Sequence, residues 1–173
     1  MKVRRTIPSR GRRSRRGNVM LESVFTFLPL LAMILFFGDL GMMLFRWTTL
    51  QNAVREGCRY AVTFQTRNGA GQDASVEQVV EKYAFGLVAA NASPNRIHVD
   101  YYSPSSPNTA ITTGGNVPGN VVEVSVQGVS LAWMFPLSGT LAGPFYASVP
   151  VGVTVRSSDI LGGYPAGTTS VNR

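Results

Sequence analysis

The chain has 173 residues and a formal net charge of +7, yet all of the excess positive charge lies in the first sixteen residues. Eight lysines and arginines occur there without an acid, whereas eight cations meet nine acids in the remainder. The overall charge therefore misleads, because the body of the chain is nearly neutral. The one cysteine, Cys58, excludes an intramolecular disulfide and a zinc site of several cysteines, and we expect it to be a small packed apolar group.

Residues 1–17 form a basic leader that directly precedes a long apolar segment. A basic arm is often a nucleic-acid tether, since lysine and arginine displace counterions from phosphate. Cations that flank an apolar segment instead hold that flank on the cytoplasmic side of a membrane. We therefore interpret residues 1–17 as a cytoplasmic leader and expect no nucleic-acid partner.

Residues 18–45 are predicted to form a transmembrane helix. Between positions 19 and 45 only Glu22 and Asp39 are charged, and a helix of about 20 residues crosses the hydrocarbon core. Pro29 removes one amide donor and is expected to bend this helix without ending it. A cleaved secretory signal is the main alternative, but its apolar core usually has about 7 to 15 residues, and no A-x-A site follows here.

At the start of this segment, Gly17 lies five positions before Glu22. This spacing resembles a type IV pilin leader, in which a membrane peptidase cuts after the glycine and a glutamate is fifth in the mature chain. The resemblance implies cleavage between Gly17 and Asn18. The new ammonium group at Asn18 would then neutralise Glu22 of a neighbouring subunit, because an unpaired carboxylate in lipid costs several kcal/mol. Hydration among the lipid headgroups is the alternative for Glu22.

Asp39 lies 17 residues beyond Glu22, about 25 Å further along a helix with a rise of 1.5 Å per residue. It is therefore expected near the outer membrane interface. Contact with Arg46, contact with a partner chain and exposure to water are all open for its carboxylate.

Residues 46–66 continue at helical spacing and are predicted to extend the membrane helix into the aqueous phase. Within this extension Ala53, Gly57 and Ala61 recur at steps of four. Small residues at that spacing permit the close approach of another helix or of a sheet, so we interpret them as assembly contacts.

The stretch from Glu22 to Ala61 resembles the TadE/TadG family, the pilin-like minor components of the tight-adherence (Tad, or Flp) pilus machinery. The matching pieces are Glu22, Leu28-Pro29, Asp39-Leu40-Gly41, Gln51-Asn52-Ala53, Arg55-Glu56-Gly57 and Arg59-Tyr60-Ala61. The resemblance implies a single-pass protein of the cytoplasmic membrane that acts by helix packing. Its implied partners are other pilin-like subunits, the major pilin, the inner-membrane pilus platform and a prepilin peptidase.

Residues 72–156 are predicted to form an extracytoplasmic α+β domain of the pilin-like type. Apolar residues from Val76 to Val88 recur at helical spacing after a capping-box pattern at Ser75 to Gln78, and Asn91 is expected to end this helix. Alternating residues then predict a small antiparallel sheet of three strands, around 97–102, 122–127 and 145–155, with Pro150 placing the last one at an edge or bulge. Residues 103–120 are expected to be a long loop, Trp133, Met134 and Phe135 core residues, and 157–173 a flexible tail.

No enzymatic chemistry is indicated. His98 is the sole histidine and lies on the polar side of a predicted strand, and no metal-ligand or phosphate-binding spacing occurs. Glu77 and Glu81 lie on one helix face, where a weak cation site is conceivable but hydration is the ordinary outcome. We expect neither cofactor nor metal. A membrane-tethered module that binds or senses an external ligand through residues 103–120 and the sheet is the alternative function.

Overall fold

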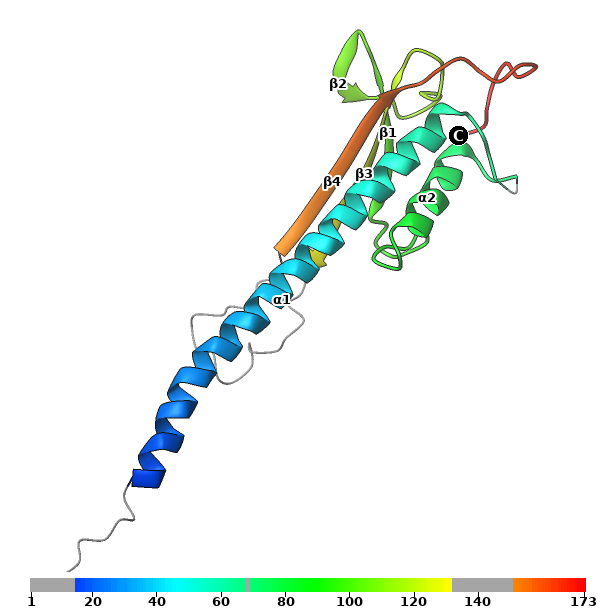
Figure 1. The fold of residues 1–173 in the computed structure, drawn as a ribbon. Helices are drawn as coiled ribbons and strands as arrows, with labels where there is room; N and C mark the ends of the chain where they lie inside the picture. The colour runs from blue at the N-terminus through cyan, green and yellow to red at the C-terminus, as the bar shows by residue number, and fades with distance from the viewer. Residues whose placement is uncertain (1–14, 68, 132–150) are drawn as a thin grey trace, which may run out of the picture. The chain divides into compact units, whose positions relative to one another are not determined.

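The computed structural model describes residues 15–67, 69–131 and 151–173, which fall into two compact units, Met1–Leu40 and Gly41–Arg173. The predicted α+β class is confirmed, with one long helix, a second helix and an antiparallel sheet (Figure 1). The elements are α1 (Arg15–Val62), α2 (Gln72–Tyr83), β1 (Ile97–Ser103), β2 (Ser106–Ala110), β3 (Val121–Leu131) and β4 (Val151–Ile160).

Helix α1 is continuous through Pro29 and ends at Val62, four residues before the predicted end. The end is marked by Phe64, whose φ of 53° lies in the left-handed region. Thr63 closes the last turn by donating its amide and its hydroxyl to the Tyr60 carbonyl, at 3.0 and 2.7 Å. The helix stops there because the left-handed backbone at position 64 cannot continue an α-helical ladder.

The sheet has four strands in the order β2-β1-β3-β4, all antiparallel, so the predicted count of three is wrong. The additional strand, β2, lies in the segment expected to be a loop. All five of its residues are exposed and it contains Pro107, so it carries no alternation of buried and exposed side chains from which a strand is recognised. Trp133, Met134 and Phe135, and the predicted strand residues before 151, lie outside the described residues.

The core of unit Gly41–Arg173 is built from one face of the sheet and the faces of both helices that cover it. Alternate residues of β1 and β3 are buried as the strand pattern predicts, and they join buried residues of α1 and α2. The fully buried members are Leu50, Ala53, Ala61, Val76, Val80, Ala84, Ile97, Tyr101, Val122, Val124 and Val126. Cys58 is also buried here, as expected, and its thiol donates to the Ser157 carbonyl at 2.9 Å.

Helix α2 begins four residues before the predicted N-terminus. Its N-cap is Gly71, and Ser75, expected to cap the helix, instead lies inside it and donates its hydroxyl to the Gly71 carbonyl at 2.8 Å. The helix ends at Tyr83, before the expected Asn91, because Phe85 and Gly86 both have positive φ angles.

Residues 157–173 differ from the expected flexible tail. The first four continue β4, which pairs with β3 as far as Ile160 opposite Val121. Further on, Leu161 is buried, and the Tyr164 ring lies 4.7 Å from the Phe64 ring, centroid to centroid. These few anchoring side chains hold a segment whose glycines and threonines suggested a lack of packing.

Arg173 joins this last segment to the N-terminus of α2. Its Nε donates to Asp73 Oδ2 at 2.7 Å, and its guanidinium group lies 4.9 Å from the centre of the Tyr101 ring. The Tyr101 hydroxyl donates to the other Asp73 oxygen, also at 2.7 Å. Both Asp73 oxygens therefore receive strong, charge-assisted hydrogen bonds from parts of the chain far apart in sequence.

Gly57 sets the distance between α1 and the elements that cover it. A Cβ atom there would lie 2.6 Å from Val80 Cγ2 and 3.5 Å from Val124 Cγ1. We predict that Gly57→Ala lowers the free energy of unfolding by about 1–2 kcal/mol, because the overpacking cost exceeds the gain in helix propensity. Chemical unfolding of the detergent-solubilised full chain measures this value.

Gly41→Ala is the matched control, since no described atom lies within 4 Å of a Cβ placed at Gly41 in the same helix. This variant is expected to be as stable as the parent, or more stable by up to about 1 kcal/mol. Equal effects of the two substitutions would contradict the close packing at Gly57.

Tyr101 makes the free energy of unfolding depend on pH in the alkaline range. Burial raises the pKa of the Tyr101 phenol, and the hydrogen bond to Asp73 raises it further. Because the unfolded phenol ionises first, at about pH 10, the stabilisation is complete below that pH and is lost as pH rises towards the higher pKa of the folded state. Between pH 8 and 11 the thermal unfolding midpoint should therefore fall less in Tyr101→Phe than in the parent chain. Parallel pH dependences would be evidence against this contribution.

Candidate assembly site on helix α1

The first part of α1 exposes a continuous apolar surface. The large apolar residues from Val19 to Ile34 are exposed among the described residues, with 39–78% of their surface accessible. The helix is long and apolar enough to cross a membrane, with a mean hydropathy of 2.2 in a window that is 0% buried. Apolar surface of this extent on a single helix is typical of a segment that is covered by lipid or by other helices.

Glu22 supplies the carboxylate within this apolar surface. It lines a shallow groove along α1 together with Val19, Ser23, Thr26, Phe27 and Leu30. The two hydroxyls are satisfied locally, because Ser23 donates to the Val19 carbonyl at 2.8 Å and Thr26 to the Glu22 carbonyl at 3.0 Å. In the part of the chain that the structure describes, no donor reaches the Glu22 carboxylate. Glu22 therefore retains its full capacity to accept hydrogen bonds or pair with a cation.

Asp39 differs from Glu22 in its surroundings. Its residue surface is 8% exposed, and the residue is not without a partner. Exposure to water, one of the three outcomes open from the sequence, does not describe this carboxylate. The two acids of the apolar segment are thus unlike, since one is buried and the other is open.

Ala53, Gly57 and Ala61 are all buried inside unit Gly41–Arg173. Gly57 faces Val76 and Val80 of α2 and Val124 of β3, and the Ala61 carbonyl accepts a hydrogen bond from the Gln72 side chain at 2.8 Å. The close approach that this small-residue ladder permits is therefore made by α2 and the sheet of the same chain.

Gly17 and Asn18 lie in the first turn of α1, which begins at Arg15. Their side chains and residues 1–14 of the predicted leader lie outside the described residues. The structure therefore gives the predicted cleavage point a helical backbone.

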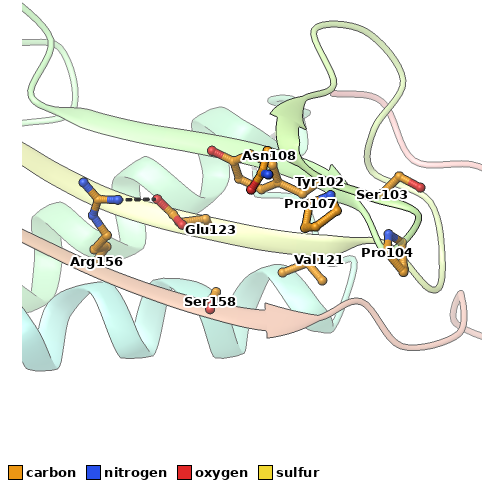
Figure 2. Close-up of a pocket in the computed structure, with 9 residues that line it drawn as sticks. All are labelled: Tyr102, Ser103, Pro104, Pro107, Asn108, Val121, Glu123, Arg156 and Ser158. Atoms are coloured by element: carbon orange, nitrogen blue, oxygen red, sulfur yellow. Dashed lines mark ion pairs between the residues drawn. The ribbon is translucent and has the colours of Figure 1, made fainter.

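The outer face of the sheet carries a second, polar groove with a volume of about 360 Å³ (Figure 2). Within it, the Arg156 guanidinium group lies 3.8 Å from a Glu123 carboxylate oxygen. Burial and the Glu123 and Asp100 carboxylates raise the pKa of Tyr102, so the phenol is a neutral donor at physiological pH. The lining residues are Tyr102, Ser103, Pro104, Pro107, Asn108, Val121, Glu123, Arg156 and Ser158.

The groove was not predicted as such, although the predicted loop 103–120 contains four of its residues. Its formation depends on β2, which folds back on β1 and brings Pro107 and Asn108 beside Tyr102. Within the described ranges, no group of three or more histidine, cysteine or acidic side chains is placed to hold a metal ion.

Residues 17–59 match the sequence model of the family described as TadE-like protein. The match begins at the predicted cleavage point and includes Glu22, Asp39, Ala53 and Gly57. No curated protein and no solved structure matches the chain. The resemblance recognised in the sequence is thus confirmed over residues 17–59.

Proposed function

From the TadE-like sequence of residues 17–59, we propose that the chain is a membrane-anchored, pilin-like structural component of a Tad-type pilus assembly or secretion machine. It acts by helix packing and subunit contact and carries out no catalysis. The observation that supports this most directly is the open Glu22 carboxylate on an exposed apolar helix surface.

Anchoring in the membrane follows from the apolar surface of α1. Burial of apolar area contributes roughly 25 cal/mol per Å², and no described residue of the chain covers the large side chains between Val19 and Leu31. The hydrocarbon core of a bilayer would remove this surface from water. The backbone N–H and C=O groups need no partner from lipid, because they are hydrogen-bonded within the helix. We place the N-terminus in the cytoplasm because eight cations precede the span. Unit Gly41–Arg173 then belongs to the extracytoplasmic side.

Assembly is assigned to Glu22. A carboxylate among lipid chains costs several kcal/mol unless it is protonated or paired, so a neighbouring subunit that supplies a cation is favoured over bare lipid. Cleavage between Gly17 and Asn18 would provide that cation as a new terminal ammonium group. Other pilin-like subunits and the inner-membrane platform are the proposed partners, and a prepilin peptidase is the proposed processing enzyme.

We predict that Glu22→Leu leaves membrane insertion intact but reduces recovery of pilus subunits with the tagged chain at least tenfold, corresponding to a loss of about 1.4 kcal/mol or more. The apolar replacement removes the paired charge while the helix stays apolar. Co-purification from detergent extracts with a differently tagged copy and with the major pilin measures the effect.

Ser23→Ala is the control for this experiment, because the Ser23 hydroxyl donates only to the carbonyl one turn before it. That variant should co-purify at the level of the parent chain. Recovery of Glu22→Leu at the same level would show that Glu22 is not the assembly contact.

Processing is tested by the intact mass of the protein purified from membranes. We expect a mass lower than that of the full sequence by residues 1–17, which corresponds to a cut between Gly17 and Asn18. Expression without prepilin peptidase serves as the control and should give the full mass. A full-length mass in the presence of the peptidase would contradict cleavage but leave anchoring untouched.

The groove on the sheet favours a second candidate, a membrane-tethered module that binds an external ligand. Its neutral phenol, amide and charged pair offer both donors and acceptors on an exposed surface. A ligand bound there would not need Glu22, so a Glu22→Leu chain that loses no function is the outcome that favours this candidate.

A further inference from the structure

Phe85 is an exposed aromatic residue in an unfavourable backbone conformation. Its surface is 78% exposed, and its φ of 50° places a bulky residue in the left-handed region. Backbone conformations of this kind are energetically unfavourable and persist where the surrounding structure demands them. The turn therefore holds a large apolar ring in water in an unfavourable backbone conformation. Gly86, the next residue, also has a positive φ, but glycine adopts it without strain.

The position of Phe85 within unit Gly41–Arg173 follows from the direction of α2. The Gln72 side chain, at the start of α2, bonds to the Ala61 carbonyl, whereas Val80, eight residues later, lies against Gly57. Helix α2 thus runs antiparallel to α1, as Figure 1 shows. The turn after α2 accordingly lies towards the end of the unit at which Gly41 stands.

The same end of the unit exposes three large apolar residues of α1. These are Leu44, Phe45 and Trp47, of which Trp47 is 41% exposed. A hydrocarbon core filled by about 20 residues that end near Leu40 would place Gly41 to Trp47 in the next 10 Å or so of helix. That distance is comparable to the headgroup layer, about 5–8 Å thick on each side of the core.

We propose that Phe85, with Leu44, Phe45 and Trp47, forms a lipid-contacting collar that seats this end of the domain in the headgroup layer of the bilayer. The inference rests on the proposed membrane anchoring. Aromatic rings are enriched at this depth, where an apolar body is removed from water. Lys82 is exposed one turn before Phe85 and supplies a cation near the phosphates. Contact with lipid removes the Phe85 ring from water, which offsets the cost of its backbone conformation.

Fluorescence quenching in phosphatidylcholine vesicles tests the collar. The full chain carries Trp47→Phe and Trp133→Phe, and a single tryptophan is then introduced by Phe85→Trp. Lipids brominated in the upper part of the acyl chains are the quencher. We expect the Phe85→Trp emission to shift to shorter wavelength and to be quenched within about twofold of a tryptophan placed in the span by Phe25→Trp.

Val117→Trp is the matched control in the same background. Val117 is also exposed but adjoins Asn116, whose side chain bonds to Gln72 at the opposite end of α2. Quenching of Phe85→Trp without quenching of Val117→Trp supports the collar. Quenching of Phe25→Trp alone, or equal quenching of Phe85→Trp and Val117→Trp, overturns it and leaves the anchor in place. Absence of quenching even for Phe25→Trp overturns the anchor and the collar together.

Discussion

One helix carries apolar residues along nearly its whole length, and each part of it must be removed from water by something. In unit Gly41–Arg173 the sheet and α2 do this, since Leu50, Val54 and Ala61 are almost completely buried. In residues 19–34 the large apolar side chains stay exposed among the described residues. The hydrophobic effect is not directional, so it favours burial of this apolar surface equally by lipid, by another subunit or by the same chain. The proposed anchoring and assembly both follow from this one requirement.

Much of the fold could be predicted from the sequence because its signals are periodic. The long apolar run predicted α1, and the alternating valines of β3 predicted a strand with one buried face, which Val122, Val124 and Val126 occupy. Both patterns depend on side chains repeating at the period of the backbone. The features that were predicted incorrectly lack such a period.

Strand β2 and the last segment of the chain illustrate this limit. Strand β2 has only exposed residues and is specified by its backbone pairing with β1, which leaves no trace in side-chain polarity. The last segment is held by the buried Leu161 and by Tyr164 and Arg173, whose partners Phe64 and Asp73 lie a hundred positions away in sequence. The start of α2 was misplaced because Ser75 fits a capping pattern equally well inside the helix, where its hydroxyl bonds to the preceding turn.

The candidate site was predicted in part for the same reason. Glu22 could be recognised because it interrupts an apolar run, and it is exposed with no donor at its carboxylate among the described residues. The ladder of Ala53, Gly57 and Ala61 was recognised as a packing surface, but the sequence does not say which chain packs on it. With α2 and β3 of the same chain against Gly57, that face of α1 has no room for a second helix. In the proposed assembly, packing with neighbouring subunits is therefore assigned to the apolar part of α1 before Asp39, where Glu22 is exposed. In that proposed contact a single buried carboxylate would fix the register between helices, because one polar group in an otherwise apolar interface favours the one alignment that pairs it.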